Sequence, residues 1–191
     1  MICCSGGATG SDYEFGRLSK QKGIELKTYS FAGHRTKIEK RIIIPDEKLK
    51  KADPMLKRVN SIINRVFPSG NSYVNKLLRR DFFTVRDADL ILAVANFTNL
   101  DNKKIVTGGT AWGVYSGILL GKQVIILNNQ TTQWFKWSQP AKKFIMSVRP
   151  IPELKRSKVF AGIGTRGINR DAIWELKTLF DQVFKTIKLS Y

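Results

Sequence analysis

Three short glycine-rich segments are the residues of this 191-residue chain best suited to chemistry. Each follows a short apolar run and precedes a stretch with helical periodicity. Glycine leaves the backbone accessible, and a helix that begins at such a turn directs free amide hydrogens and its positive dipole end at one point. An anion is the natural occupant of such a point. The segments are Ser5-Gly6-Gly7-Ala8-Thr9-Gly10, Thr107-Gly108-Gly109-Thr110 and Gly162-Ile163-Gly164-Thr165-Arg166.

Three such turns carry more weight than one, because a single glycine after a strand is most often a tight bend. All three stand at junctions from strand to helix. In an open parallel sheet these junctions share one edge. The pattern therefore predicts that the three turns converge on one crevice.

The elements that must position these turns follow from hydrophobic periodicity. Short apolar runs predict five strands, and helical patterns fall between them. Alternating strands and helices favour an α/β fold, a doubly wound, mainly parallel five-stranded Rossmann-like sheet with helices on both faces. We expect one domain over residues 1–191. The predicted strands are 1–4, 25–31, 89–97, 123–128 and 157–162, and the predicted helices are 12–22, 46–67 with a break near 53–54, 72–86, 110–120 and 169–188.

Positive charge is concentrated in two connecting segments. The formal net charge is +18, and residues 34–80 hold 13 basic against 4 acidic residues, whereas residues 136–170 hold 9 against 1. The excess either forms a positive rim that attracts polyanions or is a solvated surface. Two parts of these segments fall outside the simple alternation, a basic helical insertion at about 35–70 and a lid or hairpin at about 130–155.

Composition excludes several classes of protein. The two cysteines, Cys3 and Cys4, are adjacent and point to opposite faces of a strand, so they form no stabilising bridge. With His34 as the single histidine, we expect no metal site. No apolar stretch is long enough to span a bilayer, and the N-terminus lacks the pattern of a secretory signal. We expect a cytoplasmic protein without membrane contact.

The order of the motifs resembles the SLOG superfamily of Rossmann-like proteins. The resemblance rests on the first glycine turn with Asp12, on Arg80 and Arg86-Asp87-Ala88-Asp89 before a strand, and on Gly108-Gly109-Thr110 before Gly121-Lys122-Gln123-Val124-Ile125. That group includes DNA-processing protein A, the LOG phosphoribohydrolases and molybdenum-cofactor carriers. Residues 1–128 resemble the carriers. The closing unit, Val159 to Ile187, resembles the one that opens DNA-processing protein A. If it fills the same place in the sheet, the chain is a circular permutation of that arrangement.

The resemblance implies a site for a nucleotide phosphate formed by Gly6, Gly7, Gly108, Gly109 and Thr110, with Arg166 as a further cation. One departure concerns the phosphoribohydrolases, which carry a glutamate just beyond their second glycine motif. This chain has Ala111-Trp112-Gly113-Val114-Tyr115 there, without a carboxylate. Glycosidic cleavage passes through a cation-like sugar centre that needs a nearby carboxylate, so the departure argues against that activity.

We therefore expect the chain to bind a nucleotide, a nucleotide-derived cofactor or another phosphate-bearing small molecule between the three turns. Two alternatives stay open: a protein that binds single-stranded nucleic acid, and an N-glycosidase that acts on nucleoside monophosphates. Asp12 and Glu14 are the candidate catalytic carboxylates, and Asp12 can equally complement the dipole of its helix. Whether the chain is an enzyme or a homo-oligomer is left open. The expected ligand-binding residues are Ser5, Gly6, Gly7, Ala8, Thr9, Gly10, Arg80, Gly108, Gly109, Thr110, Gly162, Gly164, Thr165 and Arg166.

Overall fold

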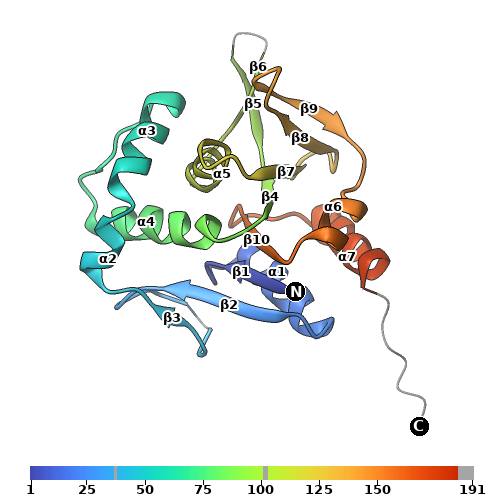
Figure 1. Cartoon of the computed structure of the whole chain (residues 1–191), viewed down its shortest axis with the longest axis horizontal. Coiled ribbons are helices and arrows are strands. Elements are labelled where there is room, and N and C mark those ends of the chain that lie inside the picture. The colour runs from blue at the N-terminus through green and yellow to red at the C-terminus, as the bar shows by residue number, and fades with distance from the viewer. Residues whose placement is uncertain (37, 101–102, 185–191) are drawn as a thin grey trace.

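The chain folds around a mainly parallel sheet with helices on both sides (Figure 1). The structure is a computed structural model that describes residues 1–36, 38–100 and 103–184. The strand order is β3-β2-β1-β10-β4-β7-β8-β9, and the six strands from β3 to β7 in this order are parallel. The strands are β1 (Ile2–Ser5), β2 (Glu25–Ser30), β3 (Ile42–Ile43), β4 (Leu90–Ala95), β7 (Gln123–Asn128), β8 (Trp134–Ser138), β9 (Lys143–Ser147) and β10 (Val159–Gly164).

The α/β class and the mainly parallel sheet are confirmed, but the expected number of five strands is wrong, because the sheet has eight. The five expected strands are the central ones, β2, β1, β10, β4 and β7. The apolar runs of β1, β10, β4 and β7 are largely buried on both faces, which gives parallel strands a recognisable pattern, whereas β2 is only partly buried. The three additional strands lie at the two ends of the sheet, where burial is one-sided and the pattern is weaker.

The helices divide between the two faces of the sheet. Apolar side chains of α1, α6 and α7 pack in one core, and those of α2, α3, α4 and α5 pack in the other. Cys3 and Cys4 show the division within one strand, because Cys3 lies in the first core and Cys4 in the second. The helices are α1 (Ser11–Gln21), α2 (Asp46–Lys50), α3 (Asp53–Ile63), α4 (Ser72–Arg86), α5 (Thr110–Leu119), α6 (Ile151–Arg156) and α7 (Arg170–Val183).

Two hairpins extend the fold at one end. Strands β8 and β9 are antiparallel and continue the sheet beyond β7, within the segment 130–155 for which we expected a lid or hairpin. A separate antiparallel pair, β5 (Phe97–Leu100) and β6 (Lys103–Val106), follows β4 directly. In Figure 1 both hairpins lie at the top of the molecule, while β2 and β3 lie at the bottom.

The segment at 35–70 contains β3, α2 and α3. Helix α3 packs against α4 and α5, so it lies on the face of the sheet that these helices cover. Of the predicted helix 169–188, residues 185–188 lie outside the described residues. Among the helices that the structure does describe, not one combines the length and the apolar character that crossing a membrane requires.

Candidate functional site: a cavity at the carboxyl ends of the central strands

A cavity of about 470 Å³ opens at the carboxyl ends of the neighbouring strands β1, β10 and β4. The turns after β1 and β10, the end of β4 and the segment between β6 and α5 form its walls. Helix α4 closes one side. The three glycine-rich turns thus contribute to one cavity, as the order of strands and helices predicts. The expected binding residues that line it are Ala8, Arg80, Gly108, Gly109, Thr110, Gly164, Thr165 and Arg166.

The other expected binding residues, Ser5, Gly6, Gly7, Thr9, Gly10 and Gly162, are not among its lining residues. Gly162 lies within β10, where a Cβ atom would collide with the ring of Phe15, so its absent side chain lets α1 approach the sheet. Gly10 has φ of 90°, and a Cβ atom there would meet the backbone of Thr165 and Arg166. These two glycines serve packing rather than an open phosphate cradle.

The first and third turns are joined by direct hydrogen bonds. The Ser11 amide donates to the Thr165 carbonyl at 3.0 Å, and the Ser11 hydroxyl donates to the same oxygen at 2.8 Å. The Thr165 amide donates in turn to the Val94 carbonyl at 2.9 Å, at the end of β4. These bonds fix the turns after β1 and β10 against β4, and so hold one wall of the cavity.

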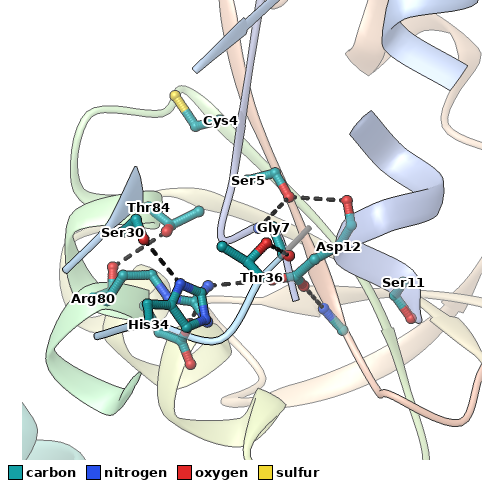
Figure 2. Close-up of polar contacts among 12 residues, drawn as sticks. Cys4, Ser5, Gly7, Ser11, Asp12, Ser30, His34, Thr36, Arg80 and Thr84 are labelled. Carbon is teal, nitrogen blue, oxygen red and sulfur yellow. Dashed lines mark hydrogen bonds and ion pairs between the residues drawn. The ribbon is translucent and has the colours of Figure 1, made fainter. Parts of the chain in front are cut away.

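An ionic cluster of Arg80, Asp12 and Asp81 lies next to this wall, and Figure 2 shows its pair of Arg80 and Asp12. The Arg80 side chain reaches from α4, and its Nη1 atom lies 3.2 Å from Oδ2 of Asp12 and 3.0 Å from Oδ1 of Asp81. Arg80 is 3% exposed and Asp12 is 5% exposed. The guanidinium occupies the space that a side chain at Gly6 would need, so the first turn presents Arg80 rather than bare backbone at that point.

Asp12 is fully engaged by its neighbours. Its Oδ1 accepts from the Gly164 amide at 3.1 Å, its Oδ2 accepts from Arg80, and the Ala8 amide also donates to its carboxylate. Burial raises the pKa of Asp12, and Arg80 and the two amides oppose that rise. The carboxylate therefore ties together the first turn, the third turn and α4. Glu14, the second candidate catalyst, instead accepts from Arg17 Nε at 2.8 Å and is not among the residues that line the cavity.

Asp81 lines the cavity and was not expected from the sequence. Burial raises the pKa of Asp81 to about 6, while the adjacent Arg80 opposes the rise. The sequence does contain a pattern that points to Asp81, because Val74, Leu77, Leu78 and Asp81 have the spacing of one helical stripe. Asp81 thus occupies a position in this apolar stripe where an apolar core residue is usual. All four side chains face the cavity.

Arg166 lines the cavity and Arg65 contacts one of its lining residues, and within the described part of the chain neither pairs with an acidic side chain. Arg166 is exposed, and its side chain forms no hydrogen bond or ion pair with any residue that the structure describes. Arg65, which follows α3, donates from Nη1 to the Gly108 carbonyl at 2.9 Å. Arg65 was also missed, because no local pattern links a residue after α3 to a turn 43 positions later.

His34 lies close enough to Arg80 to feel its charge. Its Nδ1 lies 3.0 Å from the Ser30 hydroxyl (Figure 2). Its ring also stacks on Phe31, with centroids 4.9 Å apart. Burial lowers the pKa of His34 to about 4, and the positive charges of Arg80, Arg41 and Arg166 add to this effect. The imidazole is therefore neutral at physiological pH and adds no charge near Arg80.

Comparisons with known proteins give no family for this chain: no protein-family model matches it, and neither the curated proteins nor the solved structures include a match.

Proposed function

We propose that the chain binds a nucleotide or a nucleotide-derived phosphate in the cavity at the ends of β1, β10 and β4. The observation that carries this proposal is the convergence of the three turns on one cavity of about 470 Å³, a volume within the usual range for small-molecule sites. Ligands of open α/β sheets bind at this edge of the strands.

The N-terminus of α5 is the best position for the phosphate. No side chain of the described residues caps this helix, and its first turn contains no acidic residue. By contrast, the side chain of Asn169 caps α7, and α1 has Asp12 and Glu14 in its first turn. The Ala111 and Trp112 amides donate to the Gly108 and Gly109 carbonyls, so the remaining amides and the dipole of the helix would attract the anion. Arg65 and Arg166 supply positive charge beside it.

The wall formed by α4 suits the less polar part of a nucleotide. Val74, Leu77 and Leu78 line the cavity from α4, and Ile163 lines it from β10. A base packed against these side chains would remove apolar surface from water while the phosphate stays at α5. The combination of a polar end and an apolar wall supports a nucleotide over a free inorganic ion.

Calorimetry and thermal denaturation test the proposal with inorganic phosphate, nucleoside mono-, di- and triphosphates, and dinucleotide cofactors. We expect at least one nucleotide to raise the melting temperature and the Arg166→Gln variant to bind it at least about fivefold more weakly. Arg156→Gln is the matched control, because Arg156 is also an exposed arginine. It lies in α6, which precedes the amino end of β10, whereas the cavity lies at the carboxyl end of that strand. Absence of stabilisation by every ligand would refute the proposal.

We also propose membership of the SLOG superfamily in a permuted arrangement. The position of the closing unit supports this proposal. Strand β10 is the last strand in the chain, yet it lies between β1 and β4 at the centre of the sheet. A strand that opens the fold in the usual order would occupy such a central place. A variant in which a short linker joins the two ends and the chain begins near residue 157 tests the relation, since it should fold and bind as the natural chain does.

A second candidate function is binding of single-stranded nucleic acid. Ion pairs with α4 occupy two acidic side chains of α2 and α3, because Asp46 pairs with Lys76 at 2.6 Å and Asp53 pairs with Arg79 at 2.6 Å. The exposed basic residues of the same helices therefore keep their charge available for phosphates. They include Lys48, Lys50, Lys57 and Arg58, and the exposed Lys51 directly follows α2.

Fluorescence anisotropy with a labelled oligothymidine across a salt series tests this second candidate. Neutralising Lys50, Lys51, Lys57 and Arg58 together should weaken binding and reduce the slope of log affinity against log salt by up to about 3. The control neutralises Lys142, Lys143, Lys155 and Arg156, which belong to the other basic segment. Equal losses of affinity in the two variants would count against a site on α2 and α3, and so would unchanged affinity in the variant of these two helices.

A further inference from the structure

The cavity places a carboxylate close to the expected phosphate position. Asp81 lines the cavity together with the glycines that precede α5. A Cβ atom at Gly113 would lie 4.0 Å from the Cβ atom of Asp81, so Asp81 stands beside the first turn of α5. One helical turn advances roughly 5 Å, which is about the size of one sugar. A nucleotide whose phosphate lies at the N-terminus of α5 would therefore place its sugar beside Asp81.

A carboxylate at that position repels phosphate oxygens and attracts hydrogen-bond donors. One carboxylate oxygen of Asp81, Oδ1, pairs with Nη1 of Arg80. Its second oxygen, Oδ2, accepts no hydrogen bond from any residue that the structure describes, and the side chain is 22% exposed. Asp12 differs, since both of its oxygens have partners. Asp81 therefore keeps an acceptor that is open to the cavity.

Hydroxyl groups of a sugar are the donors that match this acceptor. An ionised carboxylate accepts from neighbouring hydroxyls, and carboxylates hold ribose hydroxyls in other nucleotide-binding folds. We propose that Asp81 accepts hydrogen bonds from the ribose hydroxyls of the bound nucleotide, so that the cavity selects ribonucleotides over deoxyribonucleotides. This inference rests on the proposed nucleotide-binding function and adds its sugar specificity.

The test compares affinities for AMP, 2′-deoxy-AMP and 3′-deoxy-AMP, and for the corresponding guanine, cytosine and uracil nucleotides. Loss of a hydrogen bond to a charged acceptor should weaken binding of at least one deoxy analogue by at least about tenfold. In Asp81→Asn the preference should fall to within about twofold. Deoxynucleotide affinity should stay equal or rise in this variant, because a negative charge leaves the cavity.

Asp87→Asn is the matched control. Asp87 follows the end of the same helix, pairs with the half-buried Arg86 and does not line the cavity, so this variant should keep the full ribose preference. A structural role of Asp81 alone would lower all affinities in parallel and leave their ratio unchanged. That result would overturn the inference.

The wild-type protein provides a second measurement that needs no variant. Asp81 accepts most strongly when ionised, and the charged groups that influence it are Arg80, Asp12 and Arg166. The ratio of AMP to deoxy-AMP affinity should therefore be larger at pH 8 than at pH 5. Both ligands carry the same phosphate, so its own titration cancels in the ratio. Nucleotide binding without any ribose preference overturns this inference alone, whereas failure of every nucleotide to bind overturns the proposed function as well.

Discussion

The guanidinium of Arg80 lies directly over Gly6, in the space that any side chain at that position would occupy. Arg80 is held there by Asp12 and Asp81, so it cannot move aside without losing its buried ion pairs. Its Nε atom has no hydrogen-bond partner among the described residues. The first glycine turn therefore serves to admit a buried cation next to the cavity.

Substituting Gly6 with alanine should destabilise the fold for this reason. We expect Gly6→Ala to lower the free energy of unfolding by about 1–3 kcal/mol, since the added methyl group displaces a buried, ion-paired side chain. Urea denaturation followed by circular dichroism measures the change. In an Arg80→Ala background the same substitution should cost far less, because the obstacle is gone.

Gly70→Ala is the control for this prediction. A Cβ atom at Gly70 meets nothing within 4 Å, so the free energy of unfolding should change by less than about 0.5 kcal/mol. Equal destabilisation by Gly6→Ala with and without Arg80 would contradict the steric explanation.

Asp81→Asn should make the protein more stable at neutral pH. Burial raises the pKa of Asp81 to about 6 from its ordinary 3.8, so the folded state binds a proton more readily than the unfolded state. The free energy of unfolding therefore falls as pH rises from about 4 to about 6, and the ionised carboxylate costs stability above that range. We expect the Asp81→Asn variant to gain about 1–3 kcal/mol at pH 7 and almost nothing at pH 4.

Asp87→Asn should show the opposite sign. Hydrogen bonding to Arg86 lowers the pKa of Asp87, so its ionised form stabilises the fold, by a small amount because both side chains are well exposed. Chemical denaturation of both variants at several pH values measures these effects. A loss of stability in Asp81→Asn at pH 7 would mean that the ion pair with Arg80 outweighs the burial of the carboxylate.

Gly109→Asp should weaken nucleotide binding without lowering the stability of the fold. Gly109 precedes α5 with φ of −63° and ψ of −31°, and a Cβ atom there meets nothing within 4 Å, so an aspartate fits. Its charge would favour the helix dipole by about 0.3–1 kcal/mol and occupy the place proposed for phosphate. We expect unchanged or higher thermal stability and nucleotide affinity lower by at least about tenfold. Gly109→Asn, with the same shape and no charge, should retain most of the affinity by calorimetry.

The sequence predicted the central elements well because their physical signals are local. Strand β7 and helix α4 have the predicted bounds, 123–128 and 72–86, since continuous apolar runs and a helical stripe define them. The hairpin of β5 and β6 was missed and its first residue was assigned to the preceding strand. Its exposed Lys103 and half-buried Lys104 and Ile105 give no clear alternation, so packing against β9 rather than an intrinsic pattern defines it.

The composition of the site depended on contacts that no local pattern contains. The convergence of turns followed from the order of strands and helices, whereas the arrival of Arg65 at Gly108 depends on how α3 packs against α5. Gly6 and Gly162 have the residue type expected of a phosphate cradle. They instead admit Arg80 and Phe15, because the same absence of a side chain serves a ligand or a neighbouring residue equally well.

Glu175 links the added hairpin to the body of the protein. Its Oε1 accepts from Trp134 Nε1 at 2.6 Å and from Arg149 Nε at 2.7 Å, and its Oε2 accepts from Arg149 Nη2 at 2.7 Å. Trp134 belongs to β8, Arg149 follows β9, and Glu175 lies on α7. These bonds hold both ends of the hairpin against the helix, which favours a fixed extension of the sheet over a movable lid.

Glu175→Gln should therefore loosen the hairpin in a way that depends on pH. The carboxylate is buried, which opposes ionisation, but the bonds from Arg149 and Trp134 outweigh this and lower the pKa of Glu175 below its ordinary 4.5. The stability that it contributes is present above that value and is lost as pH falls through the lower folded pKa. We expect the free energy of unfolding to fall by about 1–3 kcal/mol at pH 7, and this loss should become smaller in acid.

Glu153→Gln in α6 is the control, and it should change the free energy of unfolding by less than about 0.5 kcal/mol. Hydrogen exchange should show faster opening of β8 and β9 in Glu175→Gln alone, and unchanged exchange there would mean that the apolar contacts of Phe135 and Phe144 suffice to hold the hairpin.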